Sequence, residues 1–286
     1  MKVLVNGTGL IGGSVIRNMR KAHPQLNIIG SDVNKANLYY LLKKHLIDHA
    51  EPFMKAASQA DVIILATPVN VIIKNLHQLT LIHLKPSVLV TDVGSSKQLI
   101  LKNAQQLMKK GVHFLGGHPF SGSHLTGSEN SRLNLFQQRA YFLVKGNATE
   151  KDVKLFEWLM NGSDAIFKMI SAEHHDQLLS FMSHLPHVVA FSLIDTIAPQ
   201  LRKMGIKPAI GAGGIRDTTR IAMGDPKVWA SIFNSNSKLI TDQINRFEQK
   251  LNDFKKIIEH HDVNKMEKDI DQDNHVRKSM GKDKSK

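Results

Sequence analysis

The sequence predicts an α/β fold in its first half and an all-helical second half. Three observations predict it: short β-rich runs recur at the spacing of strand–helix–strand units, a glycine-rich turn follows the first run, and helical spacing takes over after about Asn161. Strands that alternate with helices form a parallel sheet covered on both faces. We expect an α/β domain over 1–165, a helical domain over 166–262, and a charged, disordered tail over 263–286.

The composition is that of a globular protein. The 286 residues are 42% hydrophobic and 22% charged, and cysteine is absent. No apolar run reaches the roughly 18 residues of a membrane span, and the first apolar run is too short for a signal peptide. A chain without cysteine fits a cytoplasmic enzyme. The net charge of +13 is scattered, with few tyrosines and tryptophans, so we expect small anionic substrates as partners, with no specific nucleic acid and no membrane.

The first predicted strand, Lys2–Asn6, leads directly into a glycine-rich turn that opens a helix. Gly7, Gly9 and Gly12 have the spacing G-x-G-x-x-G. In this pattern the first glycine makes the turn, the second lets the backbone approach a pyrophosphate, and the third lets the helix pack closely on the strand. The helix N-terminus then offers free N–H groups to the phosphates. This pattern predicts a Rossmann-type nucleotide-binding domain whose turn also contains Thr8, Leu10 and Ile11.

A second apolar run ends at Asp32. A carboxylate about 20 residues beyond the last glycine of the turn binds the adenosine ribose hydroxyls and repels a 2′-phosphate. No arginine follows closely, although Lys35 is nearby, so NAD is favoured over NADP as the cofactor. The alternative role of Asp32 is to cap a helix predicted over 34–42, and the two roles can coexist.

Polar or small residues follow the ends of further predicted strands. Ligands of open α/β sheets bind outside the carboxyl ends of the strands. The residues at these ends, besides the glycine turn, are Asp32, Thr67, Pro68, Ser95 and His118. Their convergence predicts one site at this edge of the sheet.

The stretch from Phe114 to Gly127 places a histidine, His118, between two glycines and a proline. Glycines allow a sharp turn and Pro119 fixes the direction of the chain, so the imidazole is held rigidly where a general base would be useful. A surface histidine in an ordinary Gly-Pro turn is the alternative. The loop that follows contains Ser123 and His124.

Helical patterns dominate the second half. The first covers 172–197 and is interrupted at Pro186, and a long amphipathic pattern covers 235–258. The second pattern predicts a helix that packs against another helix, in the same chain or in a partner, and we interpret it as the dimer-forming helix of a homodimer. Four histidines between 174 and 187 lack a cysteine or carboxylate set with metal-ligand spacing, so no metal site is predicted. Arg220 lies in an apolar stretch and needs an anionic partner, either a substrate or a structural aspartate.

Five ordered motifs resemble those of the prephenate dehydrogenase family of tyrosine biosynthesis. They are GTGLIGGS, TDVGSSK, GGHPFSGS, SHLPH and GAGGIRDTTRIAMGDPKVW, and the similarity covers nearly all of residues 1–258. The resemblance implies a nucleotide-binding domain followed by a helical domain that dimerises by interleaving helices. It also implies NAD-linked oxidative decarboxylation of prephenate to 4-hydroxyphenylpyruvate and CO2.

The resemblance implies roles for individual residues. His118 would accept the proton of the substrate hydroxyl, and Ser95 would hydrogen-bond both that hydroxyl and the nicotinamide region. Arg220 would hold a substrate carboxylate, which suits its planar guanidinium. The remaining implied pocket residues are His175, Ser183, His187 and Trp229, with Ser123 and His124 in the loop after His118.

His124 stands where some relatives carry an acidic residue. Arogenate has an ammonium group in place of the keto oxygen of prephenate and would favour a carboxylate there, so the histidine favours prephenate. Arogenate dehydrogenase is one alternative reading, and a β-hydroxyacid dehydrogenase, which usually relies on a lysine in its helical domain, is another. A third is a non-catalytic NAD-sensing protein of the same fold.

Overall fold

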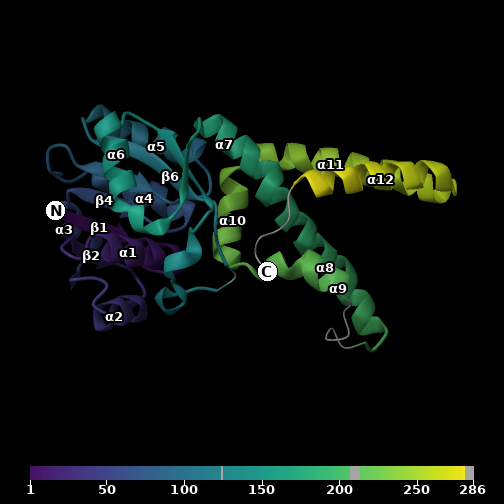
Figure 1. The fold of residues 1–286 in the computed structure, drawn as a ribbon, viewed down its shortest axis with the longest axis horizontal. Coiled ribbons are helices and arrows are strands. Elements are labelled where there is room, and N and C mark those ends of the chain that lie inside the picture. The colour runs from purple at the N-terminus through teal and green to yellow at the C-terminus, as the bar shows by residue number, and fades with distance from the viewer. Residues whose placement is uncertain (124, 207–212, 281–286) are drawn as a thin grey trace. The chain divides into compact units, whose positions relative to one another are not determined.

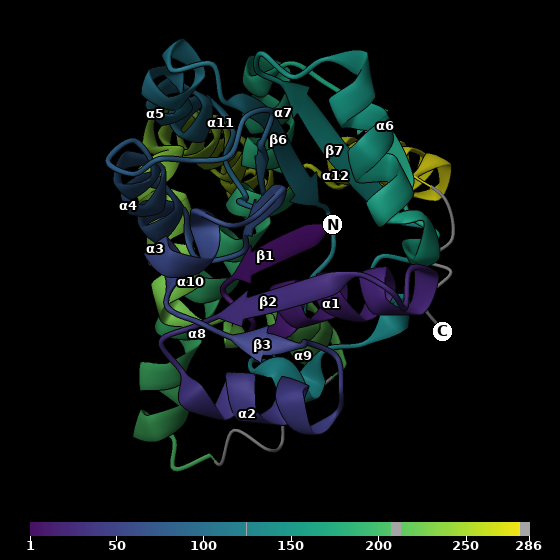
Figure 2. The ribbon, with the colours of Figure 1, turned by 90° about the vertical axis from the view of Figure 1, so that its left-hand side faces the viewer.

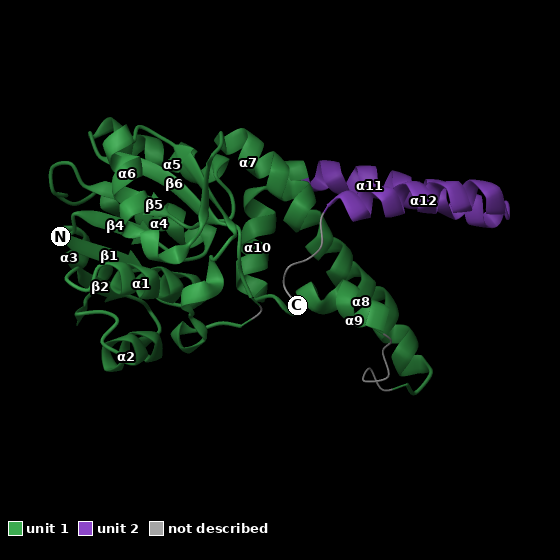
Figure 3. Ribbon diagram, viewed as in Figure 1, with its two compact units in different colours: residues 1–239 green, residues 240–286 purple. Residues whose placement is uncertain are grey.

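The computed structural model describes residues 1–123, 125–206 and 213–280. Residues 1–239 form one compact unit and residues 240–286 form a second (Figure 3). The first unit carries every predicted site residue that falls within the described ranges. His124 and the first two residues of the fifth motif lie outside them.

One eight-stranded sheet organises the first unit, in the order β3-β2-β1-β4-β5-β6-β7-β8. Figure 2 shows β2 between β1 and β3 at one end of this sheet. The strands from β3 to β6 are parallel, β7 is antiparallel to β6, and β8 is parallel to β7. The bounds are β1 Lys2–Asn6, β2 Asn27–Ser31, β3 His49–Ala50, β4 Val62–Leu65, β5 Leu89–Asp92, β6 His113–Pro119, β7 Ala140–Lys145 and β8 Ile166–Met169. The order of β1 to β6 is that of dinucleotide-binding sheets, which confirms the predicted α/β fold.

Helices cover both faces of this sheet. Successive side chains of β1 enter different cores: Val3 and Val5 belong to one, whereas Leu4 belongs to the other, because neighbouring residues of a strand point to opposite faces. Side chains of α1, α2 and α6 complete the first core, and those of α3, α4 and α5 complete the second. The bounds are α1 Leu10–Ala22, α2 Lys35–Lys43, α3 Phe53–Ala57, α4 Val69–Leu79, α5 Gln98–Lys109 and α6 Glu150–Leu159. Burial on both faces explains why these strands read as continuous apolar runs.

The sequence patterns did not predict two of the strands. β3 is only two residues long, and β8 lies after Asn161, where no strand was expected. β8 is at the edge of the sheet and most of its side chains are exposed. Its sequence is apolar apart from Lys168, which interrupts the run that is continuous in the buried strand β4. The sheet therefore extends to Met169.

A long helical segment follows the sheet (Figure 1). It consists of α7 Ala172–Leu179, a π-helical turn at Ser180–His184 and α8 Leu185–Lys203. Pro186 lies in the first turn of α8, where its missing N–H costs little, so the predicted interruption takes the form of a π-turn. By length and composition alone the segment could cross a bilayer, with a mean hydropathy of 1.3 over its most apolar window. Its polar residues His175, Asp176 and His184 are buried within the first unit, so we interpret it as a helix that packs against protein.

Shorter helices complete the first unit. They are α9 Gly213–Thr219, a 3₁₀ turn at Arg220–Met223 and α10 Pro226–Ser235. The N-cap of α10 is Asp225, whose side chain accepts hydrogen bonds from the N–H groups of Lys227 and Val228.

The second unit is also helical. Helix α11, Ser237–Glu259, begins at the end of the first unit and agrees with the amphipathic pattern predicted over 235–258. The prediction of disorder beyond it is wrong for Val263–Ser279, which form helix α12. None of the side chains of α12 is buried, so local interactions stabilise it: Asp262 caps its N-terminus through the Lys265 N–H, and Lys265 pairs with Asp269 one turn on. Residues 281–286 lie outside the described part of the chain.

Candidate active site

The glycine turn after β1 has the geometry of a phosphate-binding loop. Gly7 has φ +90°, and a Cβ on it would lie 2.6 Å from the carbonyl oxygen of Ala66. A Cβ on Gly12 would lie 1.9 Å from the carbonyl oxygen of Gly7, so only glycine lets α1 pack this closely. Gly9 has no such neighbour within 4 Å. Because Gly9 is the N-cap of α1 and no described side chain caps that helix, its N-terminal N–H groups are available to an anion.

Asp32 lies at the carboxyl end of β2 beside this turn. Its Oδ2 accepts hydrogen bonds from Thr8 N at 2.7 Å, Thr8 Oγ1 at 2.9 Å and Asn37 Nδ2 at 3.1 Å. The N-cap of α2 is Asn34, so the alternative role of Asp32 as the cap of this helix is wrong. The carboxylate is instead fixed next to the turn, where it suits the ribose of a dinucleotide.

Thr67, Pro68 and Ser95 follow β4 and β5 on the same edge of the sheet. Thr67 packs against the glycine turn, since a Cβ on Gly7 would lie 2.7 Å from its Cγ2. The Thr67 hydroxyl is buried and has no hydrogen-bond partner among the described residues. Pro68 is the N-cap residue of α4, and Ser95 is half-buried. These residues continue the site along the carboxyl ends of the strands.

His118 lies where β6 extends beyond its neighbour. β6 pairs with β5 only as far as Leu115, and it is β7, through Phe142, that pairs with His118. The His118 side chain is buried, with 6% of its surface exposed. This placement contradicts the alternative of a surface histidine in a Gly-Pro turn.

A chain of buried polar groups leads from His118 to helix α7. His118 Nδ1 lies 2.8 Å from His175 Nε2, and His175 Nδ1 lies 2.8 Å from Asp176 Oδ1. His175 and Asp176 are almost fully buried. Both ring nitrogens of His175 are therefore engaged, one by His118 and the other by Asp176. The role of His175 as a pocket residue stays a prediction.

A buried ion pair supports the backbone before His118. Lys97 Nζ forms a short hydrogen bond with Asp92 and donates another to the Gly117 carbonyl at 2.6 Å. Asp92 also accepts from the N–H groups of Gly94 at 2.7 Å and Gly117 at 3.3 Å. Burial lowers the pKa of Lys97 and raises the pKa of Asp92, while their mutual attraction acts in the opposite direction. The pair joins the ends of β5 and β6.

The surroundings of His118 favour the neutral imidazole. Burial is the largest effect that lowers its pKa, and the positive charges that His175, Lys97 and His184 can carry lower it further, to well below 6.5. At neutral pH the side chain therefore carries no charge and has one nitrogen lone pair free to accept a proton.

A second group of rings lies further along the same helical segment. His187 stacks on Trp229 with ring centroids 3.5 Å apart, and His184 meets the same tryptophan edge-on at 6.4 Å. His187 Nδ1 lies 2.9 Å from the carbonyl oxygen of Ser183. Burial lowers the pKa of His184 to about 4. Burial also lowers the pKa of His187, and the charge of Arg220 adds to that effect, which places the guanidinium within electrostatic reach of this ring.

Arg220 begins the 3₁₀ turn after α9 and is exposed. Among the described residues it makes no ion pair, so the structural-aspartate alternative has no support. It lines a pocket of about 710 Å³ together with Phe191, Ile194, Asp195, Arg216, Asp217, Thr219, Ala222 and Met223. The guanidinium is therefore open to an anionic ligand.

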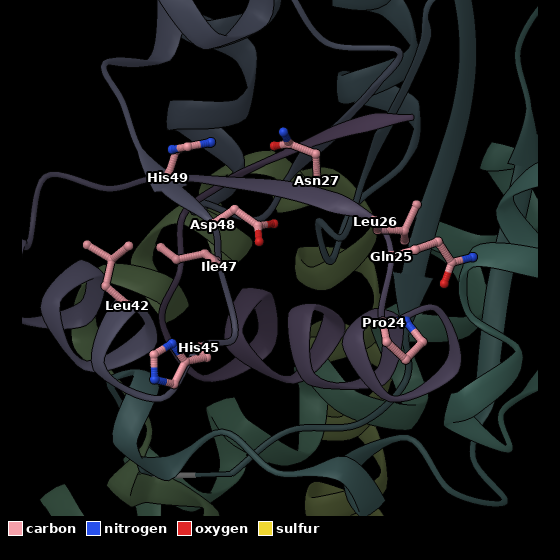
Figure 4. Close-up of a pocket in the computed structure, with 9 residues that line it drawn as sticks. All are labelled: Pro24, Gln25, Leu26, Asn27, Leu42, His45, Ile47, Asp48 and His49. Atoms are coloured by element: carbon pink, nitrogen blue, oxygen red, sulfur yellow. The ribbon is translucent and has the colours of Figure 1, made fainter.

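Another pocket, of about 640 Å³, lies on the opposite edge of the sheet (Figure 4). Its residues lie at the amino ends of β2 and β3 or at the end of α2, and Figure 4 shows His45, Asp48 and His49 among them. None of the predicted site residues lines it. Because it faces the amino ends of the strands, we do not assign it to the site.

Several residues that shape the site were not predicted as site residues: Asp92, Lys97, Asp176, His184 and Asn236. Asp92 and Lys97 are within TDVGSSK, but the sequence pattern does not show that they pair in the core. Asp176 is adjacent to His175, and this dipeptide was the available signal. Ser123 Oγ accepts a hydrogen bond from the Leu125 N–H at 3.2 Å, so it stabilises its own loop.

The fold and this site define a nucleotide-binding dehydrogenase. The family model "prephenate dehydrogenase, nucleotide-binding domain" matches residues 15–167, and "prephenate dehydrogenase, dimerization domain" matches residues 171–272. The chain belongs to the prephenate dehydrogenase family.

Curated relatives and a solved structure agree with this assignment. The chain is 35% identical to the prephenate dehydrogenase of Lactococcus lactis subsp. cremoris, covering 98% of this chain and 77% of the relative. It is 34% identical to that of Bacillus subtilis, covering 91% and 71%. The crystal structure of prephenate dehydrogenase from A. aeolicus in complex with hydroxyphenyl propionate and NAD+ has a TM-score of 0.87 at 28% identity and covers 98% of each chain.

Proposed function

We propose that this protein is an NAD-dependent prephenate dehydrogenase (EC 1.3.1.12), which converts prephenate to 4-hydroxyphenylpyruvate and CO2. The observation that carries the proposal is the buried, neutral imidazole of His118 at the carboxyl edge of a sheet whose glycine turn suits a dinucleotide. The solved relative that was crystallised with NAD+ and hydroxyphenyl propionate supports both the cofactor and an aromatic acid as ligand.

The cofactor is held by the turn from Gly7 to Gly12 and by the strand ends beside it. The N–H groups at the start of α1 suit the pyrophosphate, and Asp32 suits the ribose hydroxyls. Thr67 and Pro68 flank the nicotinamide side of the site. When bound, NAD+ accepts the hydride from the ring carbon that bears the substrate hydroxyl.

The protein's own groups position the substrate and take its proton. His118 accepts the hydroxyl proton, and Ser95 orients that hydroxyl. Arg220 binds a carboxylate of the substrate, while His187, Ser183 and Trp229 form the wall of the pocket. Ser123 and His124 are further candidate substrate-binding residues, and His124 lies outside the described residues. Loss of CO2 makes the ring aromatic, so the reaction needs orientation and a proton acceptor more than it needs strong acid catalysis.

We propose a homodimer and the predicted division into a nucleotide-binding domain and a helical domain. The matched dimerization domain supports a second copy of the chain as the partner. Large apolar side chains of α11 are exposed, including Leu251, Phe254 and Ile258, and a second copy would cover them. A cytoplasmic location fits a chain that contains no cysteine.

The test is an assay of NADH production with prephenate, arogenate and short hydroxy acids, run in parallel with NAD+ and NADP+. We expect turnover with prephenate and NAD+. The His118→Asn variant should keep its affinity for NAD+ and lose at least about 100-fold in kcat, the scale of a lost general base. Robust turnover of arogenate or of another acid, without turnover of prephenate, would replace the proposed substrate. Binding of NAD+ without turnover of any acid would indicate the NAD-sensing alternative.

A further inference from the structure

The orientation of the general base depends on which nitrogen of His118 carries its hydrogen. A neutral imidazole has one N–H donor and one acceptor nitrogen. Only a lone pair directed toward the substrate can accept the hydroxyl proton. His118 Nδ1 faces His175 Nε2 at 2.8 Å, so Nε2 is the nitrogen that remains for the substrate.

The carboxylate of Asp176 sets the direction of the whole chain of hydrogen bonds. An ionised carboxylate only accepts, so His175 Nδ1, at 2.8 Å from Asp176 Oδ1, must be the donor. The neutral His175 then presents a lone pair on Nε2 to His118. His118 Nδ1 must therefore carry a hydrogen, and its Nε2 has the free lone pair.

We infer that Asp176, acting through His175, holds His118 as the Nδ1–H tautomer and so directs the Nε2 lone pair to the substrate. Asp176 and His175 are positioning residues in this scheme, because neither contacts the reacting atoms. Only the use of this lone pair on prephenate rests on the proposed function; the tautomer itself is a property of the free protein.

Asp176 is held by groups from two other parts of the fold. Its Oδ1 accepts from the Lys97 N–H at 2.6 Å and its Oδ2 from the Gln98 N–H at 2.9 Å, at the N-terminus of α5. The backbone carbonyl of Asp176 accepts from Asn236 Nδ2 at 2.9 Å, just after α10. Asp176 therefore cannot rotate away from His175 without breaking these contacts.

The same series of hydrogen bonds, from His118 through His175 to Asp176, stabilises His118 after it has accepted the proton. The proton leaves the substrate oxygen and binds His118 Nε2, which makes the ring an imidazolium that still donates from Nδ1 to His175. The charged groups that face His118 from neighbouring elements include Lys97, whose charge is paired with Asp92, and His184, and their positive forms oppose the new charge. Asp176 is the carboxylate at the end of the chain that offsets it.

The first experiment measures the tautomer directly in the free enzyme. The protein is labelled with ¹⁵N-histidine, and the ring signals of His118 are assigned by their loss in His118→Asn. We expect a protonated Nδ1 and an unprotonated Nε2 at neutral pH. The opposite tautomer would overturn the inference whatever substrate the enzyme uses, because no turnover is involved.

The second experiment removes His175, which links His118 to Asp176. His175→Phe keeps a ring of similar shape and removes both nitrogens, so His118 loses the acceptor for its Nδ1 hydrogen. We expect kcat to fall on the order of 100-fold to 10,000-fold, the range known for loss of general-base function or of tautomer control, with the Kd for NAD+ changed less than about 3-fold. The ¹⁵N signals of His118 should show both tautomers.

The matched control is His174→Phe, because His174 is exposed on the same helix. It should leave kcat and the His118 signals unchanged. Retention of wild-type kcat by His175→Phe would overturn the inference. If that variant does not fold, the measurement on the wild-type enzyme still decides the question.

Discussion

Lys97 Nζ donates a hydrogen bond to the carbonyl oxygen of Gly117, so a buried lysine at the N-terminus of α5 supports the peptide that carries His118. The same ammonium pairs with Asp92, and both side chains are fully buried. Breaking a buried pair by removing one partner leaves an uncompensated charge in the core. The stability of this edge of the sheet therefore depends on the pair as a unit.

Lys97→Met should lower the free energy of unfolding by about 3–5 kcal/mol, because Asp92 is left charged and without its cation. Chemical denaturation measures the loss. The double variant Asp92→Asn with Lys97→Met removes both charges and should recover most of it. A double variant that is no more stable than Lys97→Met would contradict this account.

Gly9 and Gly12 belong to the same turn, but substitution by alanine should affect a different property at each position. Gly12→Ala places a methyl group against the Gly7 carbonyl, so we expect a loss of about 1–3 kcal/mol in stability, the usual cost of overpacking. A Cβ on Gly9 meets no neighbouring atom within 4 Å, and its φ of −67° suits alanine. Gly9→Ala should therefore keep the thermal stability of the wild type but weaken NAD+ binding, because the methyl group occupies the approach of the pyrophosphate.

Thermal denaturation and titration with NAD+ separate these two effects. Equal stability losses in both variants would mean that Gly9 has a packing role and does not serve the cofactor.

Arg220→Gln should raise the KM for prephenate by about 10- to 100-fold with a smaller change in kcat, since it removes a charged hydrogen-bond donor from a carboxylate. Steady-state kinetics at saturating NAD+ provide the measurement. Arg216→Gln is the matched control, because Arg216 lines the same pocket, and its KM should stay close to that of the wild type. An unchanged KM in Arg220→Gln would rule out the assigned carboxylate contact.

Stability should fall as the pH is lowered from about 6.5 towards 4. Burial lowers the pKa of His184 to about 4 in the folded protein, whereas an unfolded histidine titrates near 6.5. Between these values the unfolded chain binds more protons, so protonation favours unfolding, and His184 alone accounts for a loss of about 3 kcal/mol. The lowered pKa values of His118 and His175 act in the same direction.

Urea denaturation at a series of pH values tests the sign of this effect. The slope of stability against pH should become shallower in His184→Gln and should not change in His174→Gln, which alters an exposed histidine. A slope of opposite sign in the wild type would contradict the neutral, buried state of these rings.

The sequence predicted the parts of the fold that depend on local pattern. The apolar runs of β1 and β2 and the glycine turn are strong local signals, and each lies where it was expected. The edge strand β8 and the exposed helix α12 were missed. Lys168 interrupts the short apolar run of β8, and α12 is highly charged and buries no side chain.

The sequence indicated individual residues of the candidate site but not the contacts between them. Its motifs indicated His118, Ser95 and Asp32, since Ser95 and Asp32 follow the ends of strands and His118 lies in the last residues of β6. The contact between His118 and His175 joins residues far apart in the chain, from a strand and a helix, and no periodicity encodes such a contact. The burial of Lys97 likewise becomes visible only when α5, β5 and β6 are packed together.

The hydrogen-bonded connection from His118 through His175 to Asp176 limits how the sheet and the helical half of such proteins can be combined in chimeras. The histidine comes from the sheet and the aspartate from the first helix after it, so one working base is shared between two regions that could otherwise be exchanged as modules. A chimera that joins this sheet to the helical half of a relative without the His-Asp dipeptide should still bind the dinucleotide. It should oxidise its substrate poorly, because the helical half taken from the relative would provide no hydrogen-bond acceptor to fix the tautomer of His118.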